Sequence, residues 1–146
     1  MDIADPAFAK RFIDAQTDIY AQVLDELRAG RKHSHWMWFI FPQFDGLGFS
    51  STSRHYAIKS LDEAREYLRH PVLGARLIEC TRIVNALPGR SALAVFGSPD
   101  DLKFRSSMTL FELVAGPDSE FAAALDKYFA GARDDRTLAL VDPDKT

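Results

Sequence analysis

The segment SPDDLKFRSSMTLFELVAG, from Ser98 to Gly116, decides the fold that we predict for this chain. Ser98 as N-cap, Pro99 at the first helical position and acidic residues in the first turn indicate the start of a helix, and Gly116 indicates its end. On a helical wheel the apolar side chains cover nearly the whole circumference; they are Leu102, Phe104, Met108, Leu110, Phe111, Leu113, Val114 and Ala115. A helix that is apolar almost all round is buried. We therefore expect this helix to lie inside a mainly α-helical domain.

Amphipathic patterns on both sides of this segment predict more helices. A first helix begins with Asp5 as N-cap and Pro6 at the first position, and it ends at Gly30. Another opens with a capping box in which Ser60 is the cap and Glu63 lies three residues on. Further helical patterns cover residues 71–87, 91–97 and 117–131, with a short turn at 137–141. We expect a single compact orthogonal multi-helix domain of about six to eight helices, with little or no sheet.

The apolar block WMWFIF, residues 36–41, fits a short buried strand or a short buried helix equally well. No second strand of matching quality lies nearby, and an isolated strand would leave its backbone hydrogen-bonding groups unpaired. We therefore expect helix or irregular extended chain there, followed by a loop over residues 42–53. The single domain would take in residues 1–146, with an ordered core at about 6–141 and a frayed C-terminal tail at 142–146.

The composition is that of an ordinary globular protein. The chain has 146 residues, of which 47% are apolar and 27% are charged, values that fit one folded domain. Its single cysteine, Cys80, excludes an internal disulfide framework and favours a reducing compartment. The sequence shows no secretory signal and no apolar run long enough to span a bilayer. The spacing of His33 and His35 points to no third metal ligand, so we expect no metal. Taken with the points above, we expect a soluble cytoplasmic protein with no membrane contact and no cofactor.

The segment from Arg28 to Lys59 has the opposite charge balance to the rest of the chain. It contains five basic residues and one acid, Asp45, whereas the remainder contains 13 basic and 20 acidic residues. Three of the four histidines and both tryptophans lie in the same segment. Such a reversal marks either a surface that meets an anion or a loop of solvated charges, and the sequence leaves both interpretations open.

The residues of the predicted site come from this segment and from the buried helix. His35 and Asp45 are the candidate catalytic residues, because a histidine titrates near neutrality and Asp45 lies in the loop beside Gln43. An aspartate before a glycine is more often a turn residue, which is the structural alternative for Asp45. The candidate ligand-binding residues are Arg31, Lys32, His35, Trp36, Trp38, Gln43, Arg54, Lys103, Arg105 and Ser106.

Several candidates have a purely structural interpretation as well. His35 fits a partly buried residue that bonds a backbone carbonyl. One of Trp36 and Trp38 is expected in the core, while the other could serve as a stacking platform for a base or a sugar. Arg105 can pair with Asp101, which lies four residues earlier on the same helix.

Three unusual strings connect the chain to a known family. SHWMWFIFPQ, YAIKSLDEAREYL and SSMTLF resemble the bacterial family catalogued as domain of unknown function 1810, and the resemblance extends from Phe8 to Leu140. It implies a single, mainly helical domain and no established activity. Some members carry the label calpastatin, but that inhibitor is a disordered repeat protein, and this sequence has neither property.

We expect the chain to bind, and in a stronger form of the hypothesis to process, a small anionic ligand in a basic, aromatic cleft. The ligand would be phosphorylated or derived from a nucleotide. The alternative is a protein-interaction module without catalytic activity, in which the aromatic stretch from Phe39 to Phe49 forms an exposed patch. A nucleic-acid partner fits poorly with a pI of 5.8 and a largely acidic chain. The sequence leaves the oligomeric state and the question of enzymatic activity open.

Overall fold

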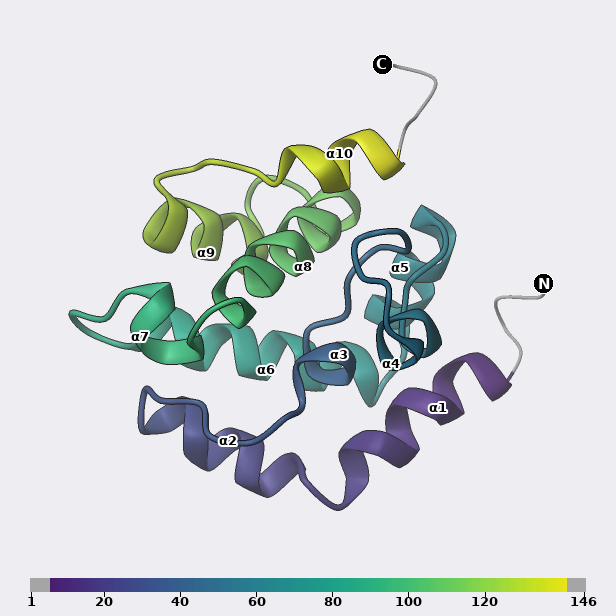
Figure 1. The fold of residues 1–146 in the computed structure, drawn as a ribbon, viewed down its shortest axis with the longest axis horizontal. Helices are drawn as coiled ribbons and strands as arrows, with labels where there is room; N and C mark the ends of the chain where they lie inside the picture. The colour runs from purple at the N-terminus through teal and green to yellow at the C-terminus, as the bar shows by residue number, and fades with distance from the viewer. Residues whose placement is uncertain (1–5, 142–146) are drawn as a thin grey trace.

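Ten α-helices make up the part of the chain that the structure, a computed structural model, describes, which is residues 6–141. They are α1 (Pro6–Thr17), α2 (Tyr20–Arg28), α3 (Met37–Ile40), α4 (Ser51–His55), α5 (Leu61–Arg69), α6 (Leu73–Ala86), α7 (Ala92–Phe96), α8 (Asp100–Ala115), α9 (Glu120–Phe129) and α10 (Asp135–Val141) (Figure 1). Because this range contains no β-strand, the predicted mainly helical fold is confirmed, although the number of helices exceeds the expectation. The predicted cap Asp5 and the predicted tail 142–146 lie outside the described residues.

Helix α8 is the central element, as its apolar character predicted. It packs against α3, α5, α7, α9 and α10, and residues 106–111 are all buried. The ring of Phe104 lies 4.5 Å from the ring of Phe96 and 5.0 Å from that of Phe41, measured between centroids. The side chains of Lys103 and Arg105, in the first two turns, are only partly buried. The buried part of α8 therefore holds the core together, while its first turns reach the surface.

The predicted helix over residues 6–30 is wrong in one respect, because it consists of two helices, α1 and α2. The hydroxyl of Thr17, the last residue of α1, donates to the carbonyl oxygen of Ile13 at 2.6 Å. The buried Gln16 donates from Nε2 to the carbonyl oxygen of Phe39 at 2.6 Å, which fixes the end of α1 against the segment of α3. The break changes the direction of the chain between α1 and α2 (Figure 1).

Most other boundaries follow the predicted signals. The hydroxyl oxygen of Ser60 accepts from the amide of Glu63 at 3.1 Å, and the carboxylate of Glu63 accepts from the amide of Lys59 at 2.8 Å. The predicted face of α6 is buried in full; it consists of Leu73, Leu77, Cys80 and Val84. The N-cap of α8 is Pro99, one residue later than predicted. Local signals therefore place these helices to within a residue or two.

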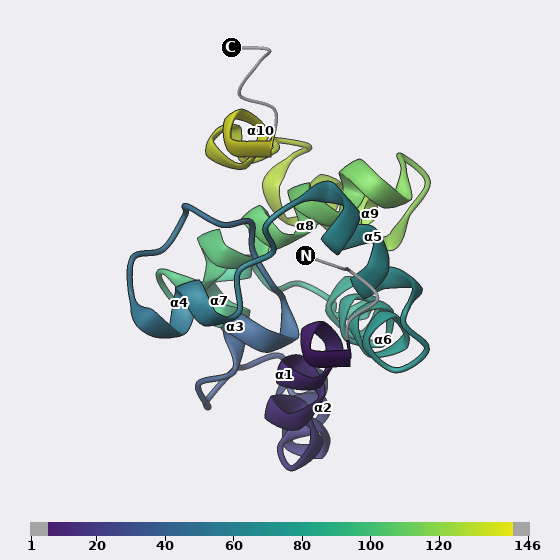
Figure 2. The same cartoon turned by 90° about the vertical axis from the view of Figure 1, so that its right-hand side faces the viewer.

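The block WMWFIF forms one helical turn, α3, so the choice of helix over strand is confirmed. The predicted loop 42–53 is wrong at its end, because α4 begins there with Ser50 as N-cap. The hydroxyl oxygen of Ser50 accepts from the amide of Ser53 at 3.0 Å. Phe44, near the start of this loop, and Ile58, which follows α4, form an isolated β-bridge. Figure 2 shows the segment and α4 on one side of the helical body.

Candidate functional site

The basic loop between α2 and α3 folds around one buried carboxylate, that of Glu26. Glu26 Oε1 accepts from the amides of His33 at 2.7 Å and Ser34 at 2.9 Å, and from Trp36 Nε1 at 3.0 Å. Its Oε2 accepts from the hydroxyl of Ser34 at 2.7 Å and from Gln22 Nε2 at 3.0 Å. All five donors converge on a side chain that is 7% exposed. The string HSHW is therefore arranged by hydrogen bonds to Glu26.

These donors also determine the charge of Glu26. Burial alone raises the pKa of a carboxyl group, but the hydrogen bonds from His33, Ser34 and Gln22 outweigh it and lower the pKa of Glu26 to about 2. The carboxylate is thus charged at neutral pH and fully hydrogen-bonded. Sequence reasoning missed Glu26, although its position on the helical wheel, beside Ile19 and Val23, lies at the edge of the apolar face of α2.

Lys32 is a structural residue in this arrangement. Its Nζ lies 2.9 Å from Asp100 Oδ2, and its side chain is 5% exposed. The same Nζ lies 5.0 Å from the centroid of the Trp36 ring and donates to the carbonyl oxygen of Ser34. Lys32 therefore links the basic loop to the start of α8 and has no free face for an anion.

The two tryptophans divide as one structural interpretation anticipated. Trp36 is fully buried and packs in the core, so it presents no surface for stacking. Trp38 is only partly buried, and Lys103 Nζ lies 4.9 Å from the centroid of its ring. Lys103 Nζ also pairs with Asp100 Oδ1 at 3.2 Å. Trp38 thus supports a lysine of α8 from the side of α3.

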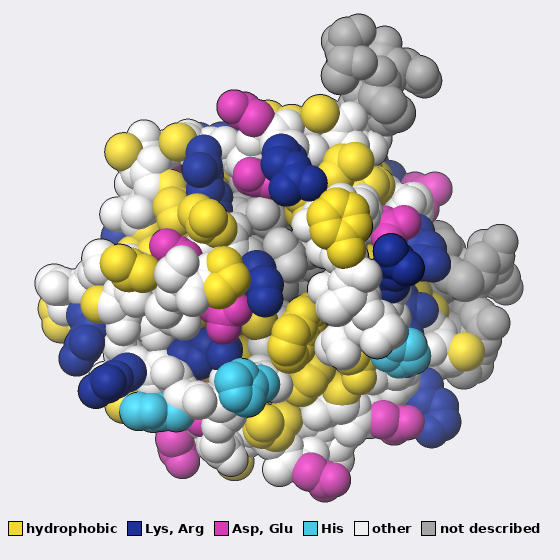
Figure 3. Space-filling model, viewed as in Figure 1, with side chains coloured by type: hydrophobic (Ala, Val, Ile, Leu, Met, Phe, Trp, Pro, Cys, Tyr) yellow, Lys and Arg dark blue, Asp and Glu magenta, His cyan; other side chains and the backbone are white. Residues whose placement is uncertain are grey.

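A cleft of about 350 Å³ lies between the loop after α3, the first turns of α8 and the start of α10. We call it the α8 cleft; its lining residues are Gln43, Leu47, Gly48, Ser53, Pro99, Leu102, Lys103, Arg105, Ser106, Asp134 and Arg136. The space-filling view shows this face hollowed near its middle, with Lys and Arg side chains at the border of the hollow (Figure 3). Four predicted ligand-binding residues therefore line one cleft, and three polar residues that the sequence did not single out join them: Ser53, Asp134 and Arg136.

A much smaller hollow adjoins the α8 cleft. It has about 10 Å³ of space and shares Gln43, Gly48 and Ser53 with the cleft. Trp38 and Asp45 line it as well. A space of this size holds about one water molecule, so it is too small for a base or a sugar ring.

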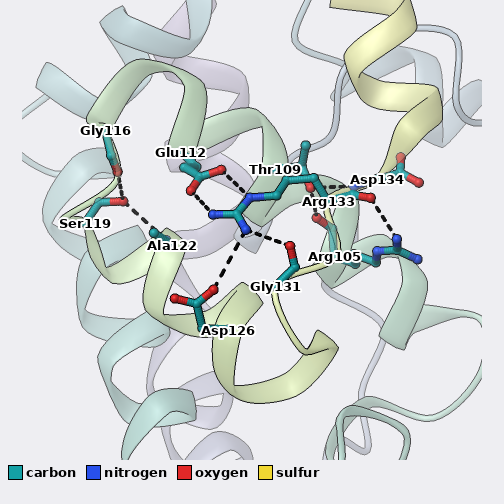
Figure 4. A network of polar contacts seen from close by, with 10 residues as sticks. All are labelled: Arg105, Thr109, Glu112, Gly116, Ser119, Ala122, Asp126, Gly131, Arg133 and Asp134. Carbon is teal, nitrogen blue, oxygen red and sulfur yellow. Dashed lines mark hydrogen bonds and ion pairs between the residues drawn. The ribbon is translucent and has the colours of Figure 1, made fainter.

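Arg105 holds the far wall of the cleft in place. Its Nε donates to the carbonyl oxygen of Ala132 at 2.9 Å and its Nη2 to that of Arg133 at 2.7 Å. The predicted pair between Arg105 and Asp101 is therefore wrong, because the guanidinium reaches across to the segment after α9 instead. Figure 4 shows this segment beside α8, bound by several polar contacts.

The other contacts of this segment involve Arg133 and Asp134. The guanidinium of Arg133 forms an ion pair with Glu112, with Nε donating to Oε1 at 2.8 Å, and Arg133 Nη1 lies 3.8 Å from Asp126 (Figure 4). The amide of Asp134 donates to Thr109 Oγ1 at 3.0 Å. Together these contacts attach the chain that precedes α10 to α8.

Asp134 is the one carboxylate in the lining of the cleft. Its Oδ2 accepts from the amide of Thr137 at 3.1 Å and from the hydroxyl of Thr137 at 2.5 Å, which caps α10. Ser106 Oγ lies 3.0 Å from the same Oδ2 and 3.1 Å from the carbonyl oxygen of Leu102. Among the described residues no donor reaches Asp134 Oδ1, and Arg136 forms no hydrogen bond or ion pair. These two groups are available to a ligand.

The remaining predicted site residues lie elsewhere. Arg31, His35 and Arg54 are exposed and do not line the α8 cleft. Of the two candidate catalytic residues, His35 precedes α3 on the surface and Asp45 borders the small hollow. No histidine lines either space, and the carboxylate beside Ser106, that of Asp134, caps α10 through the same Oδ2 that faces the hydroxyl. The geometry of the cleft therefore suits binding of an anion better than nucleophilic catalysis.

Two further features bear on chemistry. No group of three or more His, Cys, Asp or Glu side chains within residues 6–141 is arranged to hold a metal ion. In the same part of the chain, no helix combines the length and the apolar character that crossing a membrane requires.

The fold and the cleft define an all-helical protein with a small, cation-lined cleft beside its central helix. The chain belongs to the family described as protein of unknown function (DUF1810), whose model matches residues 7–141. The crystal structure of a conserved hypothetical protein from Mycobacterium tuberculosis is similar to it, with 53% sequence identity and a TM-score of 0.91. That match covers 94% of this chain and 98% of the other. A comparison with curated proteins finds no match.

Proposed function

We propose that this protein binds a small phosphorylated or nucleotide-derived anion in the α8 cleft. The observation that carries the proposal is the convergence of Lys103, Arg105 and Arg136 on one cleft of about 350 Å³. This volume lies in the range of about 300–1,000 Å³ that is typical of small-molecule sites. With Asp134 as the one carboxylate in the lining, the cleft keeps an excess of positive charge.

The three cations are not equivalent. Arg105 donates two hydrogen bonds to the carbonyl oxygens of Ala132 and Arg133, and Lys103 Nζ is paired with Asp100 at 3.2 Å. Arg136 has no partner among the described residues, so its planar guanidinium can form two parallel hydrogen bonds to a phosphate or carboxylate. We therefore assign the largest share of anion affinity to Arg136.

Neutral donors complete the cleft. Gln43 and Ser53 line it from the side of the loop, opposite Lys103 and Arg105 on α8. An amide and a hydroxyl can orient an anion without adding charge. The proposal is confined to binding, because no histidine lines the cleft and its one carboxylate, Asp134, caps α10 through Oδ2. A cytoplasmic location is part of the proposal, supported by a single free and buried cysteine, Cys80.

A thermal-shift series with inorganic phosphate, ribose 5-phosphate and AMP tests the proposal. A ligand at a hundredfold excess over its dissociation constant stabilises the folded state by about 2.7 kcal/mol, which raises the melting temperature by several degrees. Arg136→Gln should abolish the shift. Arg54→Gln removes an equal charge from an exposed residue outside the cleft and should leave the shift intact. If none of the three anions raises the melting temperature, the proposal fails.

The alternative of a protein-interaction module rests on a narrower basis. In the aromatic stretch from Phe39 to Phe49, Phe49 is 75% exposed. Phe41 is fully buried, and Phe39 and Phe44 are partly buried. The stretch therefore offers one exposed ring rather than a patch. Sedimentation velocity across a hundredfold concentration range tests self-association: a mass that stays monomeric and does not change in Phe49→Ser argues against it.

A further inference from the structure

The α8 cleft contains a group that a site for a bare anion would exclude. The carboxylate of Asp134 lines the same cleft as Lys103, Arg105 and Arg136. A negative charge at this position repels a phosphate and lowers the affinity that the three cations provide. The structural task of Asp134, which is to cap α10, uses Oδ2 alone. An asparagine or a serine could perform that task without the charge.

Among residues 6–141, the side-chain hydrogen bonds of Asp134 involve Oδ2 and leave Oδ1 free to accept from a ligand. Oδ2 receives both donors of Thr137, and Ser106 Oγ lies 3.0 Å from it. Oδ1 has no donor among the residues that the structure describes. An ionised carboxylate oxygen accepts about two hydrogen bonds and donates none. Asp134 thus presents a charged acceptor to any molecule in the cleft.

We infer that the ligand of the α8 cleft is a phosphorylated polyol or sugar whose hydroxyl groups donate to Asp134 while its phosphate binds Arg136, Lys103 and Arg105. This inference rests on the proposed function and specifies the class of ligand. The volume of about 350 Å³ leaves room for more than a phosphate group. An ammonium group would also donate to Asp134, but it would meet three cations in the same cleft, so we assign the donor to neutral hydroxyls.

Calorimetric titration with a matched pair of ligands tests this inference. Glycerol 3-phosphate and propyl phosphate have the same carbon chain and the same phosphate, and only the first carries two hydroxyl groups. The wild-type protein should bind glycerol 3-phosphate about tenfold more tightly than propyl phosphate, because a hydrogen bond to a charged group contributes that much or more. O-phosphoethanolamine, which offers an ammonium group instead, should not bind more tightly than glycerol 3-phosphate.

Two aspartate variants locate the effect. Asp134→Asn retains an oxygen for the bonds from Thr137 and Ser106 but removes the charge. It should bring the two ligands to within about twofold of each other, mainly by weakening glycerol 3-phosphate, and should not weaken propyl phosphate. Asp135→Asn makes the same change one residue away, at an exposed side chain outside the cleft lining, and should keep the tenfold preference. Melting curves of both variants verify that they are folded.

The outcomes separate this inference from the proposed function. If both phosphates bind equally well to the wild type and Arg136→Gln abolishes binding, the polyol inference is overturned and the anion site stands. If Asp134→Asn weakens both ligands to the same extent, Asp134 only positions α10 and the inference is overturned as well. If glycerol 3-phosphate, propyl phosphate, inorganic phosphate, ribose 5-phosphate and AMP all fail to bind the wild type, the proposed function fails and the inference with it.

Discussion

Trp36 donates its indole N–H to the carboxylate of Glu26 across a distance of 3.0 Å, and both side chains are buried. Together with the bonds from the amides of His33 and Ser34, this bond fixes the conformation of the basic loop between α2 and α3. The string HSHW, which looked like part of a binding site in the sequence, thus has a structural role around Glu26. None of these residues lines the α8 cleft, which lies along the first turns of α8.

Replacement of Glu26 by glutamine should destabilise the protein by about 1.5–3 kcal/mol, because the amide loses one acceptor oxygen and the negative charge that five donors share. Urea unfolding at pH 7 measures the change. Asp25→Asn, at an exposed neighbour on α2, is the matched control and should stay within about 0.5 kcal/mol of wild type. Equal effects of the two substitutions would contradict the structural role of Glu26.

The contribution of Glu26 should depend on pH in a defined direction. Its pKa is lowered from 4.5 to about 2 in the folded protein, so the folded state favours the ionised form. The resulting stabilisation, about 3 kcal/mol, is fully present above the unfolded pKa and is lost as the pH falls from about 4.5 towards 2. The difference in unfolding free energy between wild type and Glu26→Gln should therefore shrink across that interval. A difference that is constant between pH 6 and pH 3 would refute the prediction.

Lys32→Met should cost about 1–3 kcal/mol of stability without changing the affinity for phosphate. Lys32 Nζ lies 2.9 Å from Asp100 and its side chain is 5% exposed, so the substitution leaves a half-satisfied carboxylate beside the core. Asp100 keeps its second partner, Lys103, which limits the loss. Arg31→Gln, one residue earlier and exposed, should change neither quantity. A loss of phosphate binding in a stably folded Lys32→Met protein would place Lys32 in the site after all.

Gly74→Ala should destabilise the protein by about 3 kcal/mol or more. A Cβ atom at Gly74 would lie 1.9 Å from the carbonyl oxygen of Leu68, which belongs to the backbone of α5 and cannot rotate away. The close approach of α5 and α6 therefore requires glycine there. Ala75→Gly, at an exposed position of α6, is the comparison and should cost no more than about 1 kcal/mol. Thermal unfolding of the two variants gives the ranking, and a tolerated Gly74→Ala would show that the helices can separate.

Features that depend on neighbours in the sequence could be predicted. The cap at Ser60 and the apolar face of α6 follow from spacing alone, and both are present. The burial of α8 follows from its composition. The break between α1 and α2 could not be predicted, because Gln16 bonds the carbonyl oxygen of Phe39, 23 residues away, and periodicity carries no information about such a contact.

The same limit applies to the site. Gln43, Lys103, Arg105 and Ser106 were candidates because of residue type, and they meet in one cleft. Arg136 was not a candidate, because it reaches the cleft only through the fold of the last helix. Lys32 was a candidate by charge, and its burial beside Asp100 depends on a contact across 68 positions of the chain. Charge along the sequence therefore indicates which residues can bind an anion, and tertiary contacts decide which of them are free to do so.

Ionic strength should affect how firmly α10 is held against α8. In the described part of α10, Thr137 is the one buried side chain and Val141 packs partly buried against the core. Polar links just before the helix, such as the pair between Arg133 and Glu112, add to its attachment. Salt screens exposed charges over about 8 Å at physiological concentration and over shorter distances above it. Added salt will therefore weaken both the attraction of the proposed anion and the ion pair that holds the wall carrying Arg136. Affinities measured in dilute buffer will therefore refer to a cleft whose α10 wall is held more firmly than it is at high salt.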